Sequence, residues 1–149
     1  MRLLQLSSFA ILVSQVAGSK WLDGEQYTNK CGGTTWDVQV SDGSPSAADC
    51  SAIVKYMRQR TGGYFLNGLK DDIWNTLKSE GGCGFGLKPK SRGSFYMGGD
   101  DVADLIQDSI AQFEKDGKVG VTGVTQCGDE TVQWAIYGVP PSPISDVDV

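Results

Sequence analysis

The sequence contains no histidine in its 149 residues. This absence excludes Ser–His and Cys–His nucleophilic catalysis, histidine-ligated metal centres and the histidine acid–base pair of the usual ribonucleases. Carboxylate chemistry of the glycosidase type is the enzyme class that remains, because the chain has 18 acidic residues. Many of these acids, such as Asp49, Asp100 and Asp129, have a simpler role at expected helix starts and turns. We therefore predict no catalytic residue, no metal and no cofactor, with a small carboxylate hydrolase as the alternative.

Concentrated positive charge is also lacking. The longest basic cluster, residues 88–92, places three charges in an expected loop, and the whole chain has a net charge of −5. Binding to nucleic-acid phosphates needs a concentrated basic surface. The composition therefore argues against nucleic acid as a partner.

Long hydrophobic runs are absent except at the N-terminus. Arg2 precedes an apolar stretch over residues 3–13, and small residues at positions 16–18 supply a cleavage site. This order is typical of a secretory signal peptide, and the stretch is too short to span a bilayer. We expect a secreted, extracellular monomer without a membrane anchor. Its predicted parts are a signal peptide (1–18), a single domain (19–138) and a disordered tail (139–149).

Four cysteines remain after removal of the signal peptide: Cys31, Cys50, Cys83 and Cys127. An even number in an exported chain of this size indicates two disulfides. A zinc site is excluded because no two cysteines are close in sequence and histidine is absent. Three pairings are possible, and the sequence alone does not choose among them. We favour Cys50–Cys83 together with Cys31–Cys127.

Two amphipathic helices are predicted. Ser46 and Asp49 have capping-box spacing ahead of an apolar helical face at residues 53–57. The second helix has Asp100 as its expected N-cap, and apolar residues recur at three- and four-residue spacing over residues 102–113.

Short apolar or alternating segments predict strands over residues 36–40, 82–87, 93–97, 119–126 and 131–137. We expect hairpin connections at 88–92 and at 127–130. The segment 64–80 predicts either a short helix or a structured loop. Together these elements predict an α+β fold, in which an antiparallel sheet of about four to five short strands carries the two amphipathic helices on one face.

Four aromatic residues lie outside the predicted helices and strands: Trp21, Tyr64, Phe65 and Trp74. An exposed ring on an irregular segment would mark a surface for a partner. Burial at the edge of the core is the simpler alternative, because large aromatic residues are usually buried. We retain these four residues as a candidate partner surface.

A series of short motifs runs along the chain. In order they are Cys31-Gly before an aromatic strand, Ser46-Ala-Ala-Asp-Cys50, Gly82-Cys-Gly-Phe85, the helix 99–110, Lys118-Val-Gly120, Cys127 and Trp134-Ala-Ile-Tyr137. The order of these motifs and of the four cysteines resembles the fungal necrosis-inducing-factor effector domain, the family of extracellular effectors secreted by leaf-mould fungi. The segment 64–80 and the proline-rich tail have no counterpart in that pattern.

The resemblance implies a secreted fungal effector that acts in the plant apoplast. It would bind a host plant protein or cell-wall component and promote host necrosis without catalysis. No catalytic residue carries over from the family. The alternative is a killer-toxin-like or cell-wall-binding protein that antagonises competing microbes.

Overall fold

The computed structural model describes residues 18–140. The predicted signal peptide (1–18) lies outside the described residues except for Gly18, and the predicted disordered tail (139–149) lies outside them except for residues 139 and 140. Nine strands, two α-helices and one 3₁₀ turn, η1 (Glu25–Tyr27), form the described part of the chain.

The larger of two antiparallel sheets has six strands in the order β3-β9-β10-β7-β6, and β4 also pairs with β9. Its strands are β3 (Cys31–Thr34), β4 (Asp37–Val38), β6 (Asn75–Glu80), β7 (Cys83–Pro89), β9 (Val121–Cys127) and β10 (Glu130–Gly138). The smaller sheet has the order β2-β5-β8. Its strands are β2 (Ser19–Asp23), β5 (Gly62–Leu66) and β8 (Phe95–Gly98).

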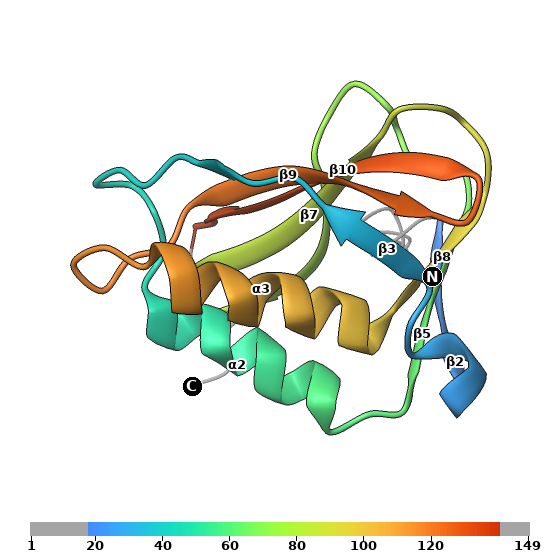
Figure 1. The fold of residues 1–149 in the computed structure, drawn as a ribbon, viewed down its shortest axis with the longest axis horizontal. Coiled ribbons are helices and arrows are strands. Elements are labelled where there is room, and N and C mark those ends of the chain that lie inside the picture. The colour runs from blue at the N-terminus through green and yellow to red at the C-terminus, as the bar shows by residue number, and fades with distance from the viewer. Residues whose placement is uncertain (1–17, 141–149) are drawn as a thin grey trace, which may run out of the picture.

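The helices α2 (Ala47–Arg58) and α3 (Gly99–Phe113) lie side by side on one face of the larger sheet (Figure 1). The core forms between them, where Ile53 and Ile106 from the helices join Phe85 and Trp134 from the sheet. Each of these four side chains is fully buried. No helix within residues 18–140 is long and apolar enough to cross a membrane.

The predicted α+β class and the two helices on one face are confirmed, whereas the number of strands is larger than expected and they form two sheets. The segment 64–80 contains no helix, because it holds the end of β5 and all of β6. β6 owes its form to hydrogen bonds with β7, and a local sequence pattern does not contain that pairing. The expected hairpin around 88–92 is wrong. β7 lies in the larger sheet, and β8 crosses to the smaller sheet to pair with β5.

Two element boundaries also differ from the prediction. The strand expected over 36–40 is only the two-residue β4, where Val38 is 46% exposed at the edge of the sheet. Helix α3 has Gly98 as its N-cap instead of Asp100. The capping carboxylate belongs to Asp101, which accepts a hydrogen bond from the Gly98 N–H at 2.7 Å. A glycine N-cap suffices here because the side chain at the third helical position supplies the acceptor.

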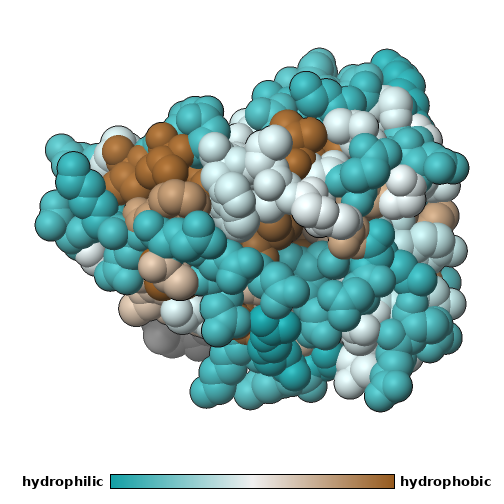
Figure 2. Space-filling model, in the orientation of Figure 1, coloured by the Kyte–Doolittle hydropathy of each residue, from teal (hydrophilic) through white to brown (hydrophobic). Residues whose placement is uncertain are grey.

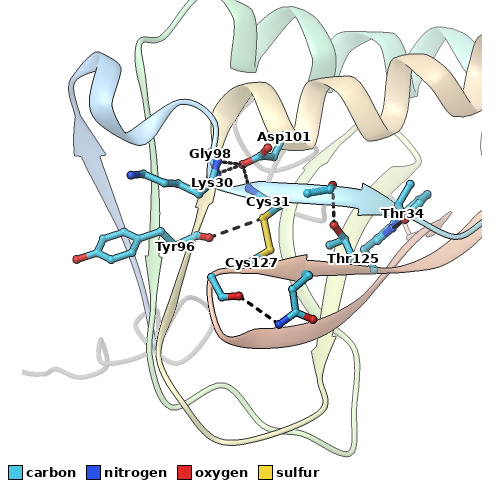
Figure 3. The surroundings of a disulfide bond; sticks show 12 residues. Lys30, Cys31, Thr34, Tyr96, Gly98, Asp101, Thr125 and Cys127 are labelled. Atoms are coloured by element: carbon cyan, nitrogen blue, oxygen red, sulfur yellow. Dashed lines mark hydrogen bonds between the residues drawn. A yellow bond between two sulfur atoms is a disulfide. The ribbon is translucent and has the colours of Figure 1, made fainter.

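Asp101 also connects α3 to the larger sheet (Figure 3). The same carboxylate oxygen accepts hydrogen bonds from the backbone N–H groups of Lys30 at 2.6 Å and Cys31 at 3.2 Å. The side chain is nearly buried. Burial raises the pKa of Asp101 above its ordinary value, and the three backbone donors oppose that rise.

The structure pairs Cys31 with Cys127 and Cys50 with Cys83, the arrangement favoured from the sequence. The first disulfide joins the facing ends of β3 and β9, which are 96 residues apart in sequence. The second joins α2 to β7 across 33 residues. On the loop-entropy model, closures of these lengths stabilise the fold by about 5 and about 4 kcal/mol.

Candidate functional site

The face of the larger sheet that points away from the helices is not covered by any helix among residues 18–140 (Figure 1). Side chains alternate across a strand. Trp134 and Ile136 of β10 are buried beneath the helices, so Ala135 and Tyr137 point to the opposite side. We call this side of the sheet the open face.

A hollow of about 360 Å³ lies on the open face and spans several strands. We call it the cross-strand hollow. Its lining residues are Gln39, Trp74, Thr76, Thr122, Ala135 and Tyr137. None of them is an acid or a base except the phenol of Tyr137.

Beneath the hollow, one row of small residues crosses four strands. Three of them line the hollow, and the Tyr137 phenol covers the fourth, Gly86. Ala135 of β10 faces Thr122 of β9 on one side and Gly86 of β7 on the other, and Gly86 in turn faces Thr76 of β6. Strands in a sheet are about 4.8 Å apart, so this row is about 14 Å long from β9 to β6. The hollow is therefore a trough that runs across the strands.

Tyr137 forms one wall of the trough. Its ring lies over Gly84 and Gly86, where a Cβ atom at Gly86 would overlap the phenol oxygen. The phenol and the Thr76 hydroxyl are hydrogen-bonded at 2.6 Å. Burial raises the pKa of Tyr137, an effect that the contact with Thr76 opposes. The phenol is thus neutral, and glycine at position 86 is what lets the ring lie against the sheet.

Trp74, which precedes β6, forms the second aromatic wall. Its ring centroid is 6.1 Å from that of Tyr137, at an interplanar angle of 53°. The Lys88 ammonium lies over the Trp74 ring, 4.7 Å from its centroid. The indole N–H of Trp74 has no hydrogen-bond partner within residues 18–140, so it is free to donate to a ligand.

The other three aromatic residues of the predicted partner surface do not join Trp74. Trp21 and Tyr64 lie on neighbouring strands of the smaller sheet and contact each other edge to face, with centroids 5.0 Å apart. Tyr64 is buried. Phe65 contacts the ring of Tyr96 at 5.1 Å on the same small sheet. The four residues therefore lie in three places: Trp21 with Tyr64, Phe65 on the opposite face of the smaller sheet, and Trp74 on the open face.

Tyr137 lies at the end of the strand expected over residues 131–137, and its place there does not mark it as part of the open face. The signal available in the sequence was the alternation of glycines in Gly82-Cys-Gly-Phe-Gly86. Glycines at every second position of a strand leave one face bare, and a large ring from a neighbouring strand can then lie on it. The identity of that neighbour depends on the β7–β10 pairing.

Acidic residues near the helices form structural contacts. Asp100 and Asp104 form ion pairs with Arg58 at 3.1 and 2.7 Å, and Asp49 accepts a hydrogen bond from the Gly82 N–H at 2.9 Å. Within the described chain, no group of three or more Cys, Asp or Glu residues could hold a metal ion. These contacts give the acids structural partners.

A second hollow of about 310 Å³ lies between β3 and α3. Trp36, Leu105 and the carboxylates of Asp101, Asp104 and Asp108 are among its lining residues. Figure 2 views this side, where hydrophilic residues cover the helices and less polar residues form a band above them. Asp101 and Asp104 are already engaged by backbone N–H groups and by Arg58. The cross-strand hollow has no carboxylate among its lining residues and has two aromatic walls, so we take it as the candidate site.

Comparison with known proteins gives one family. Residues 30–127 match Hce2, described as "Pathogen effector; putative necrosis-inducing factor". Two proteins of Penicillium expansum are similar to the chain. "Probable chitinase LysM18" is 24% identical over 148 residues, which cover 85% of this chain and 10% of the relative. "Secreted chitinase LysM12" is 30% identical over 112 residues, which cover 70% of this chain and 7% of the relative. The chain thus spans a tenth or less of these relatives.

Proposed function

The chain belongs to the Hce2 pathogen effector family, and on that basis we propose that it is a secreted fungal effector that promotes necrosis of plant tissue. It acts in the apoplast as a folded monomer by binding a host protein or cell-wall component through the open face, without catalysis. The observation that carries the proposal is the family match, which covers most of the disulfide-linked domain.

Four further features support this proposal. A relative is named as secreted, and two disulfides suit an oxidising extracellular space. The N-terminal sequence has the order of a signal peptide. The open face supplies a concave surface with aromatic walls, of the kind that binds ligands.

A second candidate function is favoured by the relatives. Both are named as chitinases, and the part of them that matches this chain is small. A cell-wall-binding protein directed against competing microbes would use the same open face for a different target.

Infiltration of purified protein into leaves tests the first proposal. The native protein should cause necrosis, whereas a sample reduced and alkylated at its four cysteines should not, because losing both disulfides removes most of the net stability of a small domain. Asp72→Ala and Glu114→Ala, at exposed positions, should keep activity within a few-fold, whereas loss of a catalytic acid would cost about 10² to 10⁴.

A growth assay on fungi and yeasts runs in parallel. Necrosis without growth inhibition supports the effector, and growth inhibition without necrosis supports the microbial antagonist. A folded carboxylate variant that loses activity a hundredfold would overturn the non-catalytic mechanism.

A further inference from the structure

We infer that the cross-strand hollow binds a neutral, β-linked hexopyranose oligosaccharide whose chain runs across the strands. This inference rests on the proposed function, because it names the ligand class of the open face through which the effector is proposed to act. The geometry of the trough, its aromatic walls and the absence of charge in its lining carry it.

The shape of the trough fits an extended, flat ligand. Its floor runs from Thr122 through Ala135 to Thr76 across neighbouring strands, and the Tyr137 phenol lies over Gly86 between the last two. A row about 14 Å long with one open side suits a short chain of sugar rings lying lengthwise. A compact ligand would fill only part of it.

The aromatic walls suit the apolar faces of sugar rings. Tyr137 is held by Gly86 beneath its ring and by the hydroxyl of Thr76, so its position is fixed before a ligand arrives. Trp74 stands next to it at 53°. Pyranose rings present axial C–H groups on their flat faces, and in a β-linked chain these faces remain accessible along an extended backbone. Preorganised aromatic rings bind such faces at little cost in conformational entropy.

Uncharged polar groups around the trough can meet the hydroxyl groups of a sugar. The Trp74 indole N–H and the Thr122 hydroxyl have no hydrogen-bond partner among residues 18–140. The Gln39 side-chain amide donates to Asp37 at 2.9 Å, which leaves its carbonyl oxygen as an acceptor. Donors and acceptors of this kind at the rim of an aromatic pocket fix the orientation of a neutral ligand.

Charge argues against other ligand classes. An anionic chain such as an oligogalacturonide would need several cations, and Lys88 beside Trp74 is the cation in contact with this site. A cationic ligand would need carboxylates. None lines the hollow, and the Asp37 carboxylate beside it already accepts a hydrogen bond from the Gln39 amide. A neutral polyhydroxylated chain is the class that matches the lining.

Titration calorimetry and two-dimensional NMR on the folded, disulfide-linked protein test this inference. The probes are hexasaccharides of β-1,4-linked N-acetylglucosamine, β-1,4-linked glucose and β-1,3-linked glucose, with α-1,4-linked glucose and galacturonic acid hexamers as controls. At least one β-linked probe should bind and shift the amide signals of β9, β10 and β7. The two control hexamers should bind at least about tenfold more weakly.

Two variants and a matched control locate the site. Trp74→Ala removes one wall, and Ala135→Gln puts a longer side chain on the floor without removing an aromatic residue. Each should weaken binding about tenfold or more. Tyr96→Ala removes an exposed aromatic ring on the smaller sheet and should leave binding unchanged within about twofold.

The outcomes separate this inference from the function itself. Failure of every β-linked probe to bind would overturn the inference, and so would binding that Ala135→Gln and Trp74→Ala leave intact. Necrosis by a protein that binds none of the sugars would leave the effector proposal standing. Sugar binding without necrosis would support the inference and contradict the effector proposal.

Discussion

Replacing Asp101 by alanine removes the carboxylate that joins the start of α3 to the start of β3. The oxygen concerned accepts from three backbone N–H groups, those of Gly98, Lys30 and Cys31. The side chain is only 7% exposed. The change leaves these donors without a partner beside the Cys31–Cys127 disulfide (Figure 3).

The expected decrease in the free energy of unfolding follows from the number of N–H donors that lose their acceptor. An unsatisfied buried N–H costs about 1–3 kcal/mol. Lys30 is exposed enough for water to replace its lost contact, so about two donors bear the full cost. We expect Asp101→Ala to lower the free energy of unfolding by about 2–6 kcal/mol, a large share of the stability of a domain of this size. Asp101→Asn keeps one acceptor oxygen and should cost about half as much.

Urea denaturation, followed by tryptophan fluorescence, measures the effect. Asp108→Ala is the control, because Asp108 lies on the same helix with an exposed side chain, and it should change the free energy by less than about 0.5 kcal/mol. If Asp101→Ala unfolds with the same midpoint and slope as the wild type, the carboxylate does not hold these two elements together.

Three further predictions concern the fold. Ile106→Ala should lower the free energy of unfolding by about 2–5 kcal/mol, because Ile106 is fully buried. Ile110→Ala should lower it less, because Ile110 is half-buried. Equal decreases in the melting temperature would contradict the assigned face of α3. The intact protein should carry no free thiol and weigh four protons less than its reduced form; labelling by a thiol reagent before denaturation would refute the pairing. Folding raises the pKa of Asp101, so around this pKa the native state binds more protons than the unfolded state. The unfolding free energy of the wild type relative to that of Asp101→Asn should therefore fall as the pH rises from below 4 through the raised pKa. A difference that grows over this pH range would show that folding lowers the pKa instead.

The helices could be predicted because their signals are local. The Ser46 cap bonds to the Asp49 N–H at 3.1 Å as its spacing indicated, and the apolar spacing of α3 places Val102 and Ile106 in the core. The β9–β10 hairpin was equally accessible, because a two-residue turn at Gly128 and Asp129 joins two alternating segments. The signals that predict such elements, turn residues and the spacing of apolar residues, lie within one short stretch of sequence.

The remaining strands depend on partners that are distant in the chain. β6 exists because Thr76 pairs with Gly86, and β8 because Phe95 pairs with Leu66. The same reason explains the candidate site. Trp74 was predicted to share a partner surface with three other aromatic residues, whereas the trough combines it with Tyr137, Thr122 and Ala135 from two other strands. The register of β10 against β7 and β9 brings them together, and no local motif encodes that register.

The central claim is that the effector acts through the open face. The most direct test compares the dose of protein that produces leaf necrosis between open-face variants and a control variant. Trp74→Ala and Ala135→Gln alter the cross-strand hollow, and Tyr96→Ala removes an aromatic ring from the smaller sheet. With all three variants shown to be folded, the first two should need about tenfold more protein than the wild type, and Tyr96→Ala about the same amount. Equal necrosis from all four proteins would contradict the claim that the effector acts through the open face.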